Sequence, residues 1–518
     1  MQSLTRVAVA AALCVLPALA GRNLQGNGKN LFWKEGKVTL RVSRTVHWAG
    51  GETGVDRREL AGSVHAAVFE AIRSWVRPGR AKVELDLDFT DTQTVSAGEN
   101  VVTFTDPAPF DTGVCDKAQY IACTLLSFTE DGAIANAVVA FNPYKRHSSV
   151  GLDGTHDIGL IMMHEMGHVL GLDHSFVADS AMGAEAEREP APGAPRMFAV
   201  HGLSEDDLSS LAALYAPAPV SAITGAVKRS DGPAAGVRVM AIDAAGRVPH
   251  GALSAEDGGY RLMVGPGEYT VIAEPADGPA AVALGQIKVQ EGGVTAGVDV
   301  VVTRDAKVTV ESVGVVVDGS YAGMPRVDLA RGREHGLALV RSPAGLAVEV
   351  MLPEPMVARS GVSSSPTSAP QLVRQAVTVM ANAPAGSYAL AVRAGLTFTM
   401  LPAWLRVVPN PEIAAIKDAE TGEVAGVLRP GRRYAIAGTD LAASEAVAAA
   451  EFEGAPATAQ LAGVAVRIAD RFVPIVSAKP GELVFQLPAV VEAGEVKLAV
   501  VAGTLMESAA VTVRLALE

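Results

Sequence analysis

The most constraining feature of this 518-residue chain is the stretch from His164 to His174, which reads HEMGHVLGLDH. His164 and His168 stand four residues apart, so on a helix both imidazoles project from one face. Gly171 can adopt the backbone angles that end such a helix sharply, and the turn then brings His174 round to the same side. The stretch therefore predicts a helix, a tight glycine turn and three imidazoles that converge on one point.

Three neutral imidazoles in this arrangement are a ligand set for catalytic Zn²⁺, with the fourth position open to water. The pKa of such a water falls to about 7, which makes hydrolysis accessible near neutral pH. Glu165 lies beside the open position and is the candidate general base. A pair of histidines four residues apart is a weak signal alone, because any amphipathic helix can carry it. Gly171 and His174 at the right offsets make the combination specific.

The extended pattern HExxHxxGxxH resembles that of the metzincin metalloproteases. Met182, the eighth residue after His174, falls where that clan has its Met-turn. The order Asp173-His174-Ser175 followed by Ser180-Ala181-Met182 resembles the matrixins specifically, as does the segment 203–215. The resemblance implies a zinc endopeptidase in which His164, His168 and His174 bind Zn²⁺, Glu165 is the general base, and Met182 and Gly171 support the site.

The matrixin resemblance covers about residues 31–216 and implies an α+β catalytic domain with a mixed twisted sheet and three helices. It would make Ile134–Phe141 the edge strand beside the cleft, where a substrate can add as an antiparallel strand. It also implies structural Ca²⁺ and often a second zinc. His147, Asp153 and His156 are candidates for such a site, although polar surface residues near the cleft are the simpler interpretation.

Two departures from the matrixin pattern limit what carries over. Matrixins of the animal type have a propeptide with a latency cysteine, whereas the ten residues between Ala20 and Leu31 contain none. Latency through a thiolate is therefore not expected. After Met182 the chain lacks the Pro-x-Tyr that lines the matrixin specificity pocket, and it inserts residues 187–195. The sequence thus leaves the substrate preference open.

The first twenty residues predict an export signal. Arg6 precedes an apolar run, Val7 to Leu19, that is too short to span a bilayer, and residues 18–20 have the small-x-small pattern of a signal-peptidase site. We expect cleavage after Ala20 and a protein that is secreted, periplasmic or extracellular. Cys115 and Cys123 then remain, and in an exported chain a disulfide between them is favoured over two reduced thiols.

Residues 31–216 alternate between strand and helix patterns. Helices are expected at 55–76, where apolar residues recur at helical spacing, at about 157–170 and at 204–215. Strands are predicted at Lys37–Val42, Val83–Phe89, Val101–Phe104 and Ile134–Phe141. Asp206 and Asp207, in the first turn of the last helix, are either solvated acids that suit the helix dipole or, as in matrixin-like folds, ties to the N-terminus or the Met-turn. Residues 216–219 (APAP) form a stiff linker.

Beyond the linker, short alternating runs separated by Gly, Pro and Asp predict three all-β sandwich domains, at 221–303, 306–409 and 411–518. The first resembles the carboxypeptidase regulatory-like sandwich. Gly386–Gly395 aligns with Gly494–Gly503 at an offset of 494 − 386 = 108 positions, and the last two domains resemble Ig-like domains of the transcription-factor-immunoglobulin type. We expect the catalytic domain to fold without them, and the sandwiches to act as spacers or as binders of a surface or polymer.

The formal charge of −13 and the pI near 5.3 argue against nucleic acid as a partner, and no later apolar run is long enough for a membrane span. The sequence predicts a secreted zinc-dependent endopeptidase that hydrolyses a protein or peptide substrate through a metal-activated water, with Glu165 as general base. The alternative is an extracellular adhesion or matrix-binding protein with an inactive metzincin domain, because residues 221–518 carry no evident catalytic motif.

Overall fold

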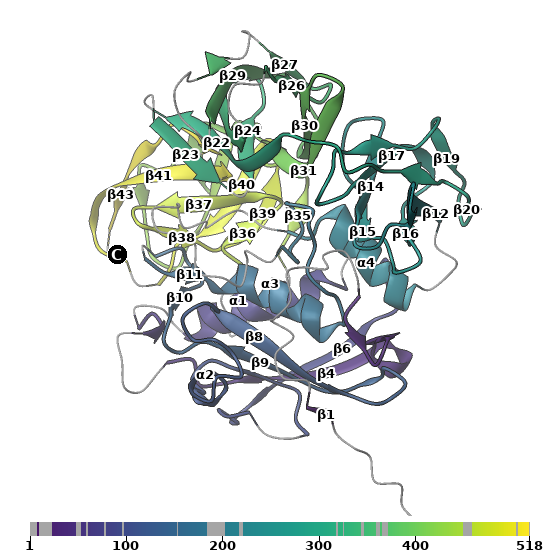
Figure 1. The fold of residues 1–518 in the computed structure, drawn as a ribbon. Helices are drawn as coiled ribbons and strands as arrows, with labels where there is room; N and C mark the ends of the chain where they lie inside the picture. Colours follow the sequence, from purple (N-terminus) through teal and green to yellow (C-terminus); the bar gives the residue numbers. More distant parts are fainter. Residues whose placement is uncertain are drawn as a thin grey trace, which may run out of the picture.

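The structure, a computed structural model, describes residues 8–9 and 23–516 apart from 48–52, 58–60, 77–78, 96–97, 153, 184–201, 217–220, 318–319, 325, 343–346, 359–362, 365–370, 449–457, 490 and 504–505. Figure 1 shows an N-terminal domain of strands and helices at the bottom and all-β units packed above it. A mixed sheet with helices, followed by a long all-β region, confirms the predicted fold class.

The N-terminal domain is built on one mixed sheet with the strand order β1-β8-β9-β7-β4-β6. Its strands are β1 (Ala8–Val9), β4 (Lys37–Ser43), β6 (Glu84–Thr90), β7 (Val101–Thr103), β8 (Ala122–Phe128) and β9 (Ile134–Phe141). β4 pairs in parallel with β6 and β7, and β7 pairs in parallel with β9, whereas β8 runs antiparallel to β9. The smaller elements are β2 (Gln25–Gly26), β3 (Lys29–Asn30), the 3₁₀ turn η1 (Lys34–Gly36), β5 (Gly54–Val55), β10 (Arg146–Ser148) and β11 (His156–Asp157).

The prediction that Ile134–Phe141 forms the edge strand is wrong. This strand, β9, pairs with β7 on one side and with β8 on the other, and its last five residues are all buried. Near-continuous burial is typical of a strand covered on both faces rather than of an edge. The strand outside it is β8, and the two-residue β1 adds to β8 by antiparallel pairing at Ser127 and Phe128.

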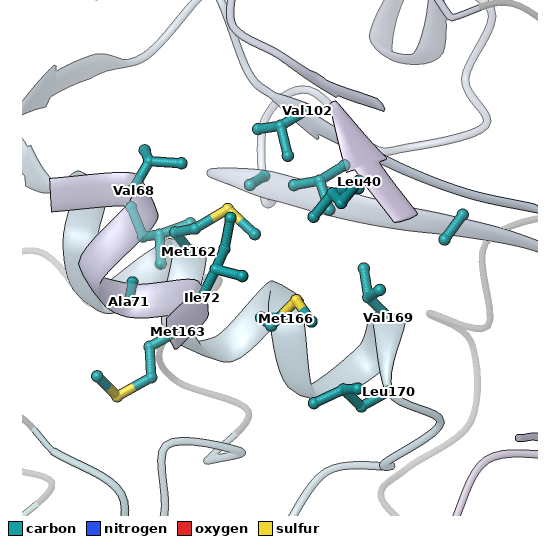
Figure 2. Packing of buried hydrophobic residues seen from close by; sticks show 14 of the residues in the cluster. Leu40, Val68, Ala71, Ile72, Val102, Met162, Met163, Met166, Val169 and Leu170 are labelled. Atoms are coloured by element: carbon teal, nitrogen blue, oxygen red, sulfur yellow. The ribbon is translucent and has the colours of Figure 1, made fainter. Parts of the chain in front are cut away.

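Helices α1 (Ala61–Ser74) and α3 (Ile158–Val169) pack against one face of this sheet, and α4 (Glu205–Tyr215) joins the same buried cluster. The single turn α2 (Ala108–Asp111), which the sequence patterns did not predict, packs through Phe110 against Ala140 on the other face. Figure 2 shows Val68 and Ile72 of α1 beside Met162 and Met166 of α3, with Leu40 of β4 nearby, and all five belong to one buried cluster. Among the described residues, no helix is long and apolar enough to cross a bilayer.

The first β module comprises β12–β21. One sheet contains β12 (Ala222–Arg229), β13 (Gly232–Pro233), β16 (Gly259–Met263), β20 (Val294–Thr295) and β21 (Val300–Val301). The other contains β14 (Arg238–Asp243), β15 (His250–Leu253), β17 (Gly267–Glu274), β18 (Ala281–Val282) and β19 (Ile287–Val289). Side chains from both sheets share one buried cluster, so this module is a sandwich.

The second β module comprises β22–β31. Its larger sheet contains β22 (Thr309–Val317), β23 (Ser320–Met324), β25 (Glu334–Ser342), β27 (Met356–Ala358), β28 (Ser363–Ser364) and β29 (Gln371–Val379). Its smaller sheet contains β24 (Val327–Ala330), β26 (Glu349–Met351), β30 (Gly386–Ala394) and β31 (Thr397–Val408). The two sheets again enclose one apolar core.

The third β module comprises β32–β43. One sheet contains β32 (Glu412–Asp418), β34 (Arg433–Thr439), β35 (Ala446–Val447), β39 (Ile475–Lys479) and β40 (Glu482–Gln486). The other contains β33 (Val427–Leu428), β36 (Gln460–Leu461), β37 (Val464–Ile468), β38 (Arg471–Val473), β41 (Gly494–Gly503), β42 (Met506–Glu507) and β43 (Val511–Leu515). The repeated segments are β30 and β41. In the second module β30 pairs antiparallel with β31, which pairs in parallel with the short strand β24. In the third module β41 pairs antiparallel with β43, which pairs in parallel with the short strand β33. The repeat therefore has the same topology in both modules.

The β modules pack against the N-terminal domain instead of extending from it as spacers. Val177 of the N-terminal domain lies in one buried cluster with residues of the first and second modules. In the third module, the Phe472 N–H donates to the Val150 carbonyl oxygen at 2.8 Å. The linker residues 217–220 lie outside the described residues. This packing argues against separate spacers, whereas folding of the catalytic domain without the modules stays a prediction.

Cys115 and Cys123 form a disulfide, which is buried beside Phe110 and Ala140. It ties the segment after α2 to the start of β8. We expect the double substitution Cys115→Ser and Cys123→Ser to lower the free energy of unfolding by about 2–3 kcal/mol, because opening a short closed loop returns conformational entropy to the unfolded chain.

Denaturation in guanidinium, followed by tryptophan fluorescence, measures this loss. The unsubstituted protein under reducing conditions is the matched control and should lose a similar amount. Unchanged midpoints in both experiments would contradict a stabilising role for the disulfide.

Candidate metal centre

Helix α3 begins at a well-formed N-cap. The side chain of Asp157 accepts hydrogen bonds through Oδ1 from the backbone N–H groups of Gly159 (2.9 Å) and Leu160 (3.1 Å). A carboxylate at this position satisfies N–H groups that have no partner within the helix, and it complements the positive end of the helix dipole. The start of the helix that carries the candidate ligands is thereby fixed.

Helix α3 ends in a glycine turn. Gly171 has a φ of 90°, and the N–H groups of Gly171 and Leu172 donate to the carbonyl oxygens of His168 and Gly167, at 2.9 Å each. This is the double hydrogen bond of a Schellman cap, which needs a left-handed residue. A Cβ at position 171 would also lie 2.3 Å from the Leu31 carbonyl oxygen, so glycine is required here for two reasons.

The turn brings His164, His168 and His174 together, and their candidate ligand nitrogens all lie within 4.8 Å of one another. Nδ1 of His164 lies 2.8 Å from the Ala181 carbonyl oxygen, and Nδ1 of His168 lies 2.9 Å from the Leu172 carbonyl oxygen. Because a carbonyl oxygen can only accept, both Nδ1 atoms carry a hydrogen, and in the neutral rings each Nε2 presents a lone pair.

These two Nε2 atoms face each other at 3.1 Å. Two lone pairs at that separation repel unless a cation lies against both, and two nitrogens bound to tetrahedral Zn²⁺ stand about 3.3 Å apart. His174 brings a third nitrogen of the same kind. Neutral imidazoles whose second nitrogen is held by a carbonyl are typical zinc ligands. The donor set therefore fits Zn²⁺.

Glu165 is buried next to His164, on the side of α3 that faces β8. The Thr124 hydroxyl lies 2.6 Å from Oε2 of Glu165 and 3.2 Å from its backbone carbonyl oxygen, so it donates to one or the other. Thr124 was not identified from the sequence. Nothing in its neighbourhood marks it, because its partner is 41 residues away in the chain.

Met182 packs beneath the helix that carries the histidines. It is only 2% exposed. A Cβ added to Gly167 would lie 2.1 Å from the Met182 sulfur and 3.0 Å from Cζ2 of Trp75. The thioether thus fills the space left by a glycine between the two helical histidines.

Residues 174–183, here called the Met-turn loop, run from the third histidine to just beyond Met182. The Ser175 N–H donates to the Met182 carbonyl oxygen at 2.8 Å, which closes the loop at its base. Asp207 of α4 holds the returning half. Its carboxylate accepts from the Ser180 hydroxyl, from the Ala181 N–H at 2.9 Å and from the Met182 N–H at 3.3 Å.

Asp206 is buried as well, so the interpretation of both acids as solvated first-turn residues is wrong. Its Oδ2 accepts from the Ser175 hydroxyl at 2.6 Å, and its Oδ1 accepts from the Gly251 N–H of the first β module at 2.7 Å. Burial, reinforced by the neighbouring Asp207, raises the pKa of Asp206 to about 8. Burial also raises the pKa of Asp207, and that of nearby Asp179 to about 6.

The other candidates from the sequence have mixed outcomes. His147 and His156 stand side by side on the paired strands β10 and β11, and both are buried, so they are not surface residues. Asp153 lies outside the described residues. Tyr215 is a packing residue, because its hydroxyl donates to the Leu170 carbonyl oxygen at 2.8 Å and accepts from the Trp33 N–H at 3.1 Å.

Residues 58–216 match the matrixin family model (Peptidase M10). This match covers Glu165, the three clustered histidines and Met182. None of the curated proteins compared with the chain matches it.

Solved structures were also compared. They include SGBP-B of the Bacteroides ovatus mixed-linkage glucan utilization locus, at 11% identity and a TM-score of 0.17, over 56% of this chain and 66% of that one. Domains 5–6 of the S-layer protein SbsC match at 16% identity and a TM-score of 0.14, over 41% of this chain and 99% of that one. The I67–I69 fragment of titin matches at 9% identity and a TM-score of 0.17, over 58% and 97%. Scores this low carry no argument about fold or function.

The buried carboxyl of Asp206 predicts a pH-dependent stability. The folded state holds its proton up to about pH 8, whereas an unfolded aspartate releases it near pH 4. Folding therefore binds a proton between these values, and this contribution to stability, complete below pH 4, is lost as pH rises toward 8. Asp206→Asn removes the titration and keeps an acceptor for the Gly251 N–H, so its stability relative to the unsubstituted protein should increase with pH.

Denaturant midpoints at pH 5, 6, 7 and 8 test this, with Glu205→Gln, an exposed first-turn acid, as the control. A stability difference between Asp206→Asn and the unsubstituted protein that is the same at pH 5 and pH 8 would contradict the assignment.

Proposed function

We propose that this protein is a secreted zinc-dependent endopeptidase. The observation that carries the proposal is the convergence of His164, His168 and His174 beside the buried carboxylate of Glu165. The matrixin match over residues 58–216 supports a metzincin-type zinc protease at the level of the family. Secretion rests on the predicted signal peptide at residues 1–20.

The histidines and Glu165 have separate roles in this proposal. His164, His168 and His174 hold Zn²⁺ through ring nitrogens, and the carbonyls of Ala181 and Leu172 fix the tautomers of the first two rings. When bound, Zn²⁺ acts as a Lewis acid that makes water acidic near neutral pH and polarises a peptide carbonyl.

Glu165 acts as the general base. Its carboxylate accepts the proton of the attacking water and later delivers that proton to the leaving amine. The Thr124 hydroxyl, 2.6 Å from Oε2, holds the carboxylate in one orientation during the transfer. Burial of Glu165 excludes bulk water that would compete for the same proton.

The substrate binds along β8 in this proposal. β8 is the outermost long strand of the main sheet. Outside it lies only β1, two residues of the predicted signal peptide, and its antiparallel pairing with the end of β8 supports the capacity of β8 to accept a further strand. Thr124 lies on β8 and contacts Glu165, so a peptide paired with this strand would pass beside the general base.

The remaining parts of the proposal rest on sequence. They are a catalytic domain at 31–216, a carboxypeptidase regulatory-like sandwich at 221–303, and two Ig-like domains of the transcription-factor-immunoglobulin type at 306–409 and 411–518. The alternating strand patterns and the repeat at an offset of 108 positions support these divisions.

Glu165→Gln should leave Zn²⁺ bound while the rate of casein cleavage drops by about 10²–10⁴-fold, because the amide cannot accept the proton of the attacking water. The matched control is Glu205→Gln, a first-turn residue of α4 that is exposed and pairs with Arg80. Proteolysis by Glu165→Gln at the rate of the unsubstituted protein would contradict the assignment of Glu165 as general base.

The purified protein should contain zinc at about one ion per chain, and a chelator should lower its melting temperature, because a ligand that binds only the folded state stabilises it. His174→Ala should weaken zinc binding and abolish most of the chelator effect. Absence of zinc together with chelator-insensitive stability and no proteolysis would favour the alternative of an extracellular adhesion protein.

A further inference from the structure

The tip of the Met-turn loop is inserted between the first and second β modules. Val177 is completely buried. It belongs to a cluster with apolar side chains from both modules, namely Met240, Val248, Ile272, Ala280, Ala389, Ala391, Met400 and Ala403. The neighbouring Phe176 packs against the same cluster and lies under the guanidinium of Arg238, whose Cζ is 5.9 Å from the ring centre.

Polar contacts hold the tip at the same place. The Ala178 N–H donates to the Pro402 carbonyl oxygen of the second module at 3.1 Å. Asp179 is partly buried, and its carboxylate is attracted by Arg326 and Arg406 of the second module. The tip is therefore held by backbone, apolar and charged contacts that all come from the β modules.

The base of the same loop belongs to the metal centre. It begins at His174 and returns to Ala181, whose carbonyl accepts from Nδ1 of His164 at 2.8 Å. The hydrogen bond from the Ser175 N–H to the Met182 carbonyl oxygen keeps the two halves together. A shift of the tip therefore moves both the third ligand and the group that orients the first.

Two further contacts tie β modules to elements of the same centre. The Gly251 N–H of the first module donates to Asp206, which also accepts from the Ser175 hydroxyl of the loop. Gln460 of the third module donates from Nε2 to Oδ2 of Asp157, the N-cap of α3, at 3.2 Å. The modules thus contact the loop, the helix behind it and the start of the ligand-bearing helix.

We propose that the β modules are a structural part of the metal centre, and that the first and second modules position His174 and the Ala181 carbonyl by holding the tip of the Met-turn loop. This inference rests on the proposed zinc site. Val177, Asp179 and Gly251 are positioning residues in this arrangement, since they act through the loop without touching the ligands.

A wedge in the first module tests the proposal in the full-length protein. A Cβ at Gly251 would lie 2.6 Å from Cζ of Phe176 and 2.9 Å from Cγ2 of Val177, so Gly251→Val pushes directly on the tip. Gly265→Val in the same module is the matched control, because a Cβ there meets no atom within 4 Å. Neither glycine has a positive φ, so valine adds bulk without backbone strain.

The readout is the zinc dissociation constant, measured by competition with a chromophoric chelator, together with hydrogen exchange of the loop amides. Gly251→Val should raise the dissociation constant about tenfold or more, as loss of outer-shell support does, and should speed exchange in residues 174–183. Gly265→Val should leave both unchanged. Equal zinc affinity in the two variants would overturn the proposal.

A second pair of variants covers the case in which Gly251→Val does not fold. Val177→Ala shortens the buried side chain at the tip without adding bulk, and Val373→Ala makes the same change in the core of the second module, away from the loop. Weaker zinc binding in Val177→Ala alone supports the proposal, and equal binding in both variants rejects it. An unsubstituted protein that binds no zinc would reject the proposed function itself, which separates the two failures.

Discussion

The repulsion between the facing lone pairs of His164 and His168 is the constraint on which the rest of the site depends. Their Nε2 atoms stand 3.1 Å apart, and a backbone carbonyl behind each ring prevents either proton from moving to relieve the repulsion. Such an arrangement raises the free energy of the metal-free protein, so the surrounding structure has to hold it. The cap at Asp157 fixes the start of α3, the turn at Gly171 fixes the direction of the chain, and the Met-turn loop returns the Ala181 carbonyl to the first ring.

Two adjacent buried acids connect this site to the rest of the molecule. Consecutive helical residues point roughly 100° apart, so Asp207 reaches the Met-turn while Asp206 reaches the Ser175 hydroxyl and Gly251. Burial of two carboxyls is unfavourable, and it is offset here by N–H and hydroxyl donors that would otherwise lack partners in tight turns. Because burial raises the pKa of Asp206 to about 8, a proton on it also relieves the repulsion between the neighbours at neutral pH.

The sequence could predict the features that depend on local spacing. The positions of the histidines and of Gly171 predict α3 and its turn, and alternation predicts β4, β6 and β7 within a residue or two. Alternation does not predict β8, because Leu125 and Leu126 stand together and interrupt it. The wrong edge assignment of β9 comes from the matrixin resemblance. The Thr124 bond to Glu165 spans 41 residues and the Gln460 bond to Asp157 spans 303. Contacts between residues so far apart in the chain produce no periodic pattern of residue types in either segment.

The packing of the β modules does have a sequence signal. It differs from the alternation of apolar and polar residues that is typical of a sandwich strand with one face in water. In β14 the inward side chains Val239 and Ala241 fill the core of the first module, and Met240 between them, completely buried, points to the Met-turn loop. In β30 the same alternation puts Leu390 into the core of the second module and small alanines on the outside. A strand that is apolar on both faces is a strand covered on both faces. The small outer residues of β30 allow the close approach of Val177, so the outer faces of two sandwiches, each with a complete core of its own, form the socket for a loop of the metal centre.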